Sequence, residues 1–199
     1  MRIRFTTTLG NIPTKEIEQG FASIAEQFSM SWRLHDMSSK PKAMVLVSKF
    51  DHCLVDLIYR TQTSALNMEI AGVFSNHEKN RHYAERENIP FTYFDVQKET
   101  KTESEQLLRQ IITSHNIELI VLARYMQVLS ADFTADFPGQ IINIHHSFLP
   151  SFKGAVPYSR AFERGVKMIG ATAHYVTATL DEGPIITQNV APVRHDMTV

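Results

Sequence analysis

The sequence has almost no cysteine, since Cys53 is the only one among 199 residues. A single thiol rules out a disulfide within the chain and is typical of proteins in the reducing cytoplasm. No stretch reaches the roughly 18 consecutive apolar residues that a transmembrane helix needs. The first residues lack the apolar segment of a signal peptide. We therefore expect a soluble, cytoplasmic protein.

An excess of one charge is also missing. The formal net charge is −1, and the basic residues are scattered along the chain. A protein without a basic patch has no electrostatic field that would attract nucleic acid or an acidic membrane surface. The composition is 43% hydrophobic and 21% charged, which is enough for one sizeable core. We expect neither a nucleic-acid partner nor a membrane partner.

The sequence gives no sign of a metal site. A structural or catalytic zinc site needs three or four converging ligands. The lone cysteine has no C-x-x-C partner, and most of the histidines stand far apart, at positions 35, 52, 77, 82, 115, 174 and 195. We therefore expect a protein that binds no metal ion.

Residues 1–40 predict a strand, a helix and a second strand. Ile3 and Phe5 alternate with polar residues, and the segment 30–37 alternates in the same way. Between them, apolar residues recur at helical spacing after Pro13, which suits a first helical turn. Forty residues are too few for a stable domain, so we expect this segment to pack on the rest of the chain or on a second subunit.

After residue 40 the pattern changes to short apolar runs at 43–48, 69–75, 118–123 and 140–145. Nearly continuous runs of this kind are typical of strands covered on both faces. Helical stretches lie between them, at about 52–63, 79–87 and 101–115. This alternation predicts an α/β fold with a doubly wound, mostly parallel, Rossmann-like sheet. Two further strands are expected at about 170–176 and 184–190.

Polar side chains follow the run at 140–145, in the sequence "IINIHHSFLP". Asn143 and His145 are two residues apart and would project from the same face of a strand. Asp181 lies in a loop that a neighbouring strand could bring close. An amide, an imidazole and a carboxylate together suit attack on a carbonyl group, because they supply an oxyanion donor and a proton-transfer pair. Spacing alone leaves open that the histidine is structural and that Asp181 is a turn residue.

Two other segments could line a site. Lys153 and Gly154 lie in a Pro/Gly-bounded loop that leads into a helix near Pro157, and they could line a cavity or only form a turn. The backbone of "LARYMQVLS" (122–130) could recognise a flat heterocycle, or it could simply connect a strand to a helix. We expect His146 to have a packing or supporting role, with its side chain pointing away from that of His145 if the strand continues past His145. We expect His174 to be a satisfied buried or supporting histidine.

Three motifs in order resemble the superfamily of folate-dependent formyltransferases and hydrolases. They are Asn143-Ile144-His145, "HHSFLPSFKG" (145–154) and "DEGPI" (181–185). Within that superfamily, the stretches 51–60, 121–130 and 169–186 are similar to the formyltetrahydrofolate deformylases. The resemblance covers the chain from about residue 40, which implies a formyltransferase-like catalytic domain at 41–199 with a shortened C-terminal part. Residues 1–40 resemble part of an ACT-like regulatory domain.

The resemblance implies hydrolysis of 10-formyltetrahydrofolate to tetrahydrofolate and formate, which would supply formate for purine biosynthesis and balance one-carbon pools. Asn143 and His145 would stabilise the tetrahedral intermediate, and Asp181 would position the attacking water. No cofactor is implied beyond the folate substrate itself. An unpaired strand edge in residues 1–40 would favour a homodimer or higher homo-oligomer. The implied substrate-binding residues are Met126, Gln127, Val128, Leu129, Ser147, Lys153, Gly154, Thr177, Thr179 and Glu182.

Two alternatives remain open at this point. The transferase branch of the superfamily carries a glycine-rich turn after its first strand, where backbone amides bind the phosphate of an acceptor such as glycinamide ribonucleotide. Here the matching stretch is "SKFDH" (48–52), in which Lys49 and Asp51 stand in place of glycines. Their side chains would obstruct a phosphate, which favours water as the nucleophile over an amine acceptor. A non-catalytic folate-binding module is the other alternative.

Overall fold

The computed structural model describes residues 3–7, 12–152, 154 and 156–199. The chain divides into two compact units, residues 1–39 and residues 40–199. Each unit is described by itself.

The first unit is built around helix α1 (Thr14–Gln27). The ring of Phe21 meets the ring of Trp32 edge to face, with centroids 4.9 Å apart. The two strands predicted beside this helix are wrong, because residues 3–7 and 30–36 are not in strands; residue 2 lies outside the described residues. Alternation produces a strand only where a second strand pairs with it. Ile3 and Phe5 instead lie exposed, and the ACT-like character of this segment stays a prediction.

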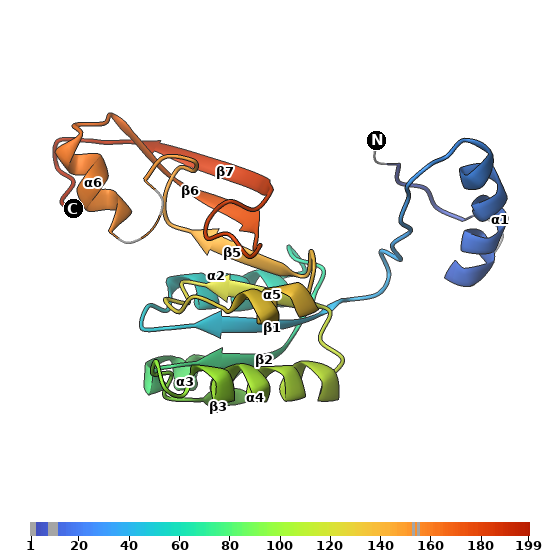
Figure 1. Ribbon diagram of the computed structural model, residues 1–199, viewed down its shortest axis with the longest axis horizontal. Coiled ribbons are helices and arrows are strands. Elements are labelled where there is room, and N and C mark those ends of the chain that lie inside the picture. Colours follow the sequence, from blue (N-terminus) through green and yellow to red (C-terminus); the bar gives the residue numbers. More distant parts are fainter. Residues whose placement is uncertain (1–2, 8–11, 153, 155) are drawn as a thin grey trace. The chain divides into compact units, whose positions relative to one another are not determined.

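The second unit contains one seven-stranded sheet in the order β3-β2-β1-β4-β5-β6-β7, which Figure 1 shows from the bottom of the view to the top. The first five strands are parallel, and β6 and β7 are antiparallel additions beside β5. This is the predicted α/β, Rossmann-like architecture. The strands are β1 (Lys42–Val47), β2 (Glu69–Ser75), β3 (Phe91–Tyr93), β4 (Leu119–Ala123), β5 (Ile141–His145), β6 (Met168–Tyr175) and β7 (Ile185–Pro192).

The helices lie between the strands in chain order, largely where the periodicity predicts them. Strand β3 and helix α5 escaped prediction, because elements this short carry too little periodic signal. No helix in the described part of the chain is long and apolar enough to cross a membrane. The helices are α2 (His52–Gln62), a 3-10 turn η1 (Glu78–Asn80), α3 (Arg81–Arg86), α4 (Lys101–Ser114), α5 (Ala131–Asp136) and α6 (Pro157–Glu163).

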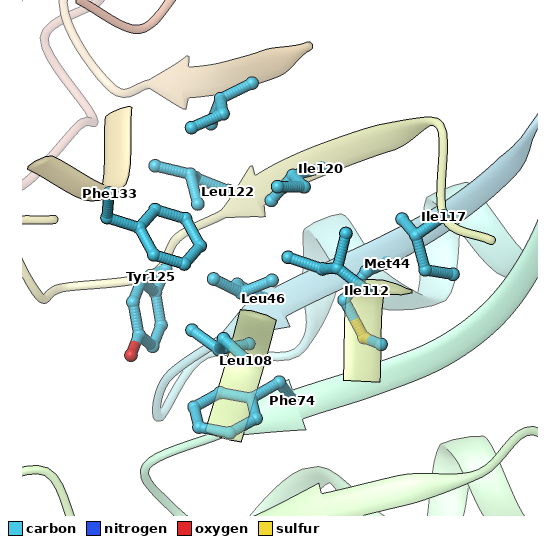
Figure 2. Packing of buried hydrophobic residues seen from close by; sticks show 11 residues of the cluster. Met44, Leu46, Phe74, Leu108, Ile112, Ile117, Ile120, Leu122, Tyr125 and Phe133 are labelled. Atoms are coloured by element: carbon cyan, nitrogen blue, oxygen red, sulfur yellow. The ribbon is translucent and has the colours of Figure 1, made fainter. Parts of the chain in front are cut away.

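Two hydrophobic clusters cover the two faces of the sheet. Successive residues of a strand point to opposite faces, so Leu46 of β1 packs with Leu108 of α4 on one face, while Val45 and Val47 pack with Leu54 of α2 on the other. Figure 2 shows the first cluster, where strand and helix side chains interdigitate. It contains the buried residues Met44, Leu46, Phe74, Leu108, Ile112, Ile117, Ile120, Leu122, Tyr125, Phe133 and Ile141.

The winding direction of the chain reverses between β1 and β4. In an open parallel sheet the loops that leave such a pair of strands diverge, and their carboxyl ends border a ligand-binding crevice. The Ser48 hydroxyl, directly after β1, accepts a hydrogen bond from the Met126 amide after β4 (2.9 Å) and donates one to Asn76 Oδ1 (2.7 Å). This hydroxyl therefore ties together the loops at the reversal point.

The core makes a direct prediction for stability. Phe74 is 0% exposed, so Phe74→Ala leaves a cavity and should lower the free energy of unfolding by about 3–5 kcal/mol. Urea denaturation followed by far-UV circular dichroism measures this change. The matched control is Phe162→Ala, because Phe162 on α6 is 70% exposed. Equal losses in the two variants would contradict the packing described above.

Candidate active site

Asn143 and His145 project from the same face of β5, at its carboxyl end. His145 is 5% exposed and Asn143 is half-buried. The antiparallel strand β6 places His174 opposite Asn143 and Thr172 opposite His145. Asn143 and His145 therefore lie on a strand that has the parallel strand β4 on one side and the antiparallel strand β6 on the other.

Asp181 reaches the same place from the loop between β6 and β7. Its carboxylate Oδ1 lies 3.4 Å from His145 Nδ1, and its Oδ2 accepts a hydrogen bond from the Gly154 amide (3.2 Å). A carboxylate facing Nδ1 favours the tautomer that carries its proton there, which leaves a lone pair on Nε2. His145 Nε2 is buried and has no hydrogen-bond partner among the described residues. The imidazole is thus arranged to exchange a proton through Nε2.

His174 holds Asn143 in place. Its Nδ1 donates a hydrogen bond to the carbonyl of Tyr175 (2.8 Å), so the proton of this ring is on Nδ1. The Nε2 of the same ring then accepts from Asn143 Nδ2 (3.3 Å). The satisfied buried histidine that the sequence predicts at position 174 also orients the side-chain amide of the site, and one N–H of that amide remains for a ligand.

The surroundings of His145 and His146 favour the neutral form of both rings by lowering their pKa values. Burial lowers the pKa of His145; Asp181 opposes this shift, whereas His174 and Arg124 add to it. Burial, together with the charges of Arg124 and His145, lowers the pKa of His146 to about 4. A neutral His145 is the form that can accept a proton.

The condition under which His146 would point away from His145 is not met. Strand β5 ends at His145, so strand alternation does not extend to the next residue. The two rings lie 5.4 Å apart, and the ring of Tyr158 meets the His146 ring at 5.8 Å. His146 lines the same cavity as His145.

A cavity of about 230 Å³ opens at these residues. The catalytic trio predicted from the sequence lines it, as do six of the predicted substrate-binding residues, so the structure brings these distant segments together. Its wall consists of Leu122, Arg124, Tyr125, Met126, Gln127, Val128, Leu129, Asn143, Ile144, His145, His146, Gly154, His174, Val176, Thr177, Ala178, Leu180 and Asp181.

Other predicted binding residues lie elsewhere. Ser147 is 3% exposed, and its hydroxyl donates to the Ser151 carbonyl (3.3 Å), so it anchors its loop and does not line the cavity. Thr179 and Glu182 are exposed outside the cavity wall, because the loop turns there: the Glu182 amide bonds the Thr179 carbonyl (3.4 Å). Lys153 lies outside the described residues, and its role stays a prediction.

The loop from residue 124 to residue 130 is fixed by a buried carboxylate that sequence reasoning missed. Glu105 of α4 is 5% exposed and accepts hydrogen bonds from the Ser130 amide (2.7 Å) and the Ser130 hydroxyl (2.5 Å). Burial raises the pKa of Tyr125, and the charge of Glu105 raises it further. No signal in the sequence reveals this contact, because its two residues are 25 positions apart.

Gly183 allows the loop that carries Asp181 to approach the end of β6. A Cβ atom at this position would lie 1.7 Å from the Tyr175 carbonyl oxygen. No side chain fits at that distance, so only glycine brings the loop this close. The Tyr175 amide also bonds the Pro184 carbonyl (2.9 Å), which fixes the loop at its far end.

The profile of the formyl transferase family matches residues 41–199. The chain belongs to the formyl transferase family. The match covers the whole of the seven-stranded sheet and every residue of the cavity wall.

Formyltetrahydrofolate deformylases are similar to this chain in sequence and in structure. A formyltetrahydrofolate deformylase of Bacillus subtilis is 49% identical over 195 residues, which are 98% of this chain and 65% of that protein. The crystal structure of a formyltetrahydrofolate deformylase from Pseudomonas syringae superimposes with a TM-score of 0.89 at 42% identity, covering 94% of this chain and 63% of the other. The chain therefore spans less than two thirds of these relatives.

A second branch of the family is more distant. The crystal structure of phosphoribosylglycinamide formyltransferase from Anaplasma phagocytophilum superimposes with a TM-score of 0.72 at 32% identity. The match covers 80% of this chain and 76% of that one. The two branches share the fold, so the difference between them has to be sought in the residues around the site.

Gly183→Ala should disrupt the site without touching its polar residues. The added methyl group pushes the loop away from β6 and carries the Asp181 carboxylate away from His145, at a cost of about 1–3 kcal/mol in stability. We expect chemical-shift changes at the His145 ring, measured by NMR. The control is Gly20→Ala, where nothing lies within 4 Å of the added methyl group. Unchanged His145 signals in the Gly183 variant would contradict this account.

The low pKa of His146 predicts a pH dependence of stability. The folded chain has a pKa of about 4 at this ring, whereas an unfolded chain has about 6.5. Between these values the unfolded state binds more protons, so the free energy of unfolding should fall as pH falls from about 6.5 to about 4. Urea denaturation at a series of pH values measures this slope, which His146→Gln should reduce. An NMR titration midpoint of His146 near 6.5 would refute the shift.

Proposed function

We propose that the chain hydrolyses 10-formyltetrahydrofolate to tetrahydrofolate and formate. The observation that carries the proposal is the His145 imidazole, whose Nδ1 faces the Asp181 carboxylate while its buried Nε2 has no partner among the described residues. A water molecule that donates to Nε2 becomes a nucleophile, because the ring takes its proton as the oxygen attacks the formyl carbon. The Asp181 carboxylate stabilises the imidazolium that forms.

The bond changes balance in two steps. In the first, the water oxygen bonds to the formyl carbon, and the electron pair of the carbonyl moves to its oxygen. The free N–H of Asn143 donates to that oxyanion, which is the role of a preorganised donor in acyl transfer. In the second, the carbon–nitrogen bond breaks, the folate nitrogen keeps the electron pair and takes the proton from His145, and formic acid loses its own proton to give formate.

The cavity wall supports a folate as the substrate. The backbone of residues 126–129 offers N–H and C=O groups to the edge of a heterocycle, while Met126 and Val128 present apolar side chains, 52% and 57% exposed. Ser48 and Glu105 hold both ends of this loop. A flat, polar-edged ring such as a pterin fits a rigid loop of this kind. The proposed reaction uses water and the folate alone, without a further cofactor.

Water is the acceptor in this proposal because of the residues after β1. Lys49 is exposed at this turn. Asp51 follows it and accepts a hydrogen bond from the Tyr83 hydroxyl (3.0 Å), which lowers the pKa of the Asp51 carboxyl and keeps it negative. A negative charge there repels the phosphate of a ribonucleotide acceptor. Transfer of the formyl group to an amine, the reaction named for the more distant branch, is the second candidate.

The biological setting is also part of the proposal. The chain would act in the cytoplasm, supply formate for purine biosynthesis and balance one-carbon pools. Residues 1–40 would form part of an ACT-like segment, and the chain would assemble as a homodimer or a higher homo-oligomer.

The Asp181→Asn variant tests the mechanism. Removing the carboxylate charge removes the stabilisation of the imidazolium, so formate release from 10-formyltetrahydrofolate should fall on the order of a hundredfold, or about 2.7 kcal/mol in the barrier. A coupled formate assay measures the rate, and circular dichroism checks folding. The control is Asp56→Asn, since Asp56 lies on the surface of α2 and pairs with Arg60 of the same helix.

The fate of the formyl group separates the candidate functions. The same assay is repeated with glycinamide ribonucleotide present. Formylated ribonucleotide that forms faster than free formate would favour the transferase. Tight folate binding without any turnover of the formyl group, in a chain that is folded, would favour a binding module. An unchanged rate in Asp181→Asn would reject the mechanism whichever product forms.

A further inference from the structure

Arg124 is a half-buried cation that the proposed mechanism does not use. It follows β4 directly, at the sheet's reversal point, and lines the cavity beside the catalytic residues. Of the described residues in the cavity wall, Arg124 is the single lysine or arginine and Asp181 the single carboxylate. The Asp181 oxygens already face His145, His174 and the Gly154 amide. Among the described residues, the Asp181 carboxylate thus pairs with these groups and not with Arg124.

The guanidinium has donors that no described residue accepts. Its Nε and Nη1 atoms are both buried and without a hydrogen-bond partner. Buried N–H groups of a cation are costly to leave unpaired, so an arrangement of this kind points to an acceptor supplied by a ligand. Each of these nitrogens is a charged donor for an anionic oxygen, and Nη1 together with Nη2 forms one of the two forks through which a guanidinium binds a carboxylate.

Two other arginines show what Arg124 lacks. Three guanidinium groups in the described chain lie over a phenylalanine ring, those of Arg81, Arg109 and Arg124, at 4.8, 5.0 and 5.1 Å from the ring centroid. The Nε of Arg81 donates to Glu78 (2.6 Å), and that of Arg109 donates to Asp136 (2.7 Å). Of these three arginines, Arg124 alone has an Nε without a carboxylate partner among the described residues. The contact with the Phe50 ring holds the plane of the Arg124 guanidinium, while its Nε and Nη1 atoms remain without a hydrogen-bond partner among the described residues.

The backbone of Arg124 is in the left-handed region, with φ +61°. Residues with a side chain rarely adopt this conformation, and those that do are concentrated at functional sites, where the surrounding structure holds them. Asp181, on the other side of the cavity, is in the same region, with φ +56°. The two charged residues of the wall are thus both held in strained conformations.

We propose that Arg124 binds the carboxylate of formate as it forms in the cavity; this assignment rests on the proposed hydrolysis. The reaction turns a neutral formyl group into an anion, and the unpaired guanidinium fork provides the matching cation. A reaction that passes the formyl group to an amine produces no free carboxylate and needs no such group. Arg124 is therefore a residue that suits hydrolysis in particular.

The test measures binding of formate to the free chain, without folate. Carbon-13 formate is titrated and its NMR linewidth followed, with ionic strength held constant by chloride. A ligand of so few atoms binds with a Kd of about 1 mM at best, so the titration extends well above that value. We expect saturable binding to the wild type and about tenfold or more weaker binding to Arg124→Gln, because the charged fork is lost. Arg124→Lys should fall between them.

Matched variants distinguish the loss of the formate site from a loss of folding. Arg109→Gln removes a guanidinium that is stacked in the same way but paired with Asp136, and it should leave formate binding unchanged. Arg124→Gly removes the side chain and relieves the left-handed backbone, so it stays folded even where Arg124→Gln does not. Equal formate binding in the wild type and in the folded Arg124 variants overturns the assignment.

Two further results would also overturn it. One is the absence of saturable formate binding to the wild type, and the other is chloride competing as well as formate, which would show a site for any small anion. Because the titration uses no folate, its outcome is independent of the formate-release assay. A chain that binds formate through Arg124 without releasing it from the folate would contradict the proposed function and not the binding site.

Discussion

The contact between the His145 ring and the Asp181 carboxylate is the interaction on which the site depends. It joins the end of a buried parallel strand to a loop 36 residues further along the chain, and it exists because β6 returns antiparallel beside β5. The same return brings His174 opposite Asn143 and orients the side-chain amide. Gly183 lets the loop close onto β6. One strand pairing thus positions three polar side chains at once.

Burial controls the chemistry of that contact. A solvent-exposed histidine beside a carboxylate would be favoured as a cation, whereas desolvation here lowers the pKa of His145. The ring is kept neutral and its Nε2 is kept free of protein partners among the described residues. The positive charge of Arg124 acts in the same direction on both His145 and His146. Burial of these two rings therefore determines which proton transfer the site can perform.

The rigid framework explains how exposed loops keep a defined shape. The two loops at the reversal point are joined by the Ser48 hydroxyl, and Glu105 holds the far end of the cavity loop through Ser130. These are buried polar contacts whose loss leaves unpaired groups in the interior, so they resist rearrangement. The cavity wall is thereby fixed before any ligand arrives, which limits the entropy lost on binding.

Most strands and helices from residue 42 onward, though not β3 and α5, could be predicted from the sequence, because buried parallel strands are continuous apolar runs. The polar trio could be predicted as well, because the order of its motifs along the chain can be read directly. The sequence predicted wrongly two strands in residues 1–40, where alternation finds no strand to pair with among the described residues. Only the tertiary structure decided that His174 supports Asn143, that Glu105 fixes the cavity loop, and that no carboxylate of the described residues pairs with Arg124. These contacts join residues far apart in the sequence, and burial, which gives them their strength, is a property of the folded chain alone.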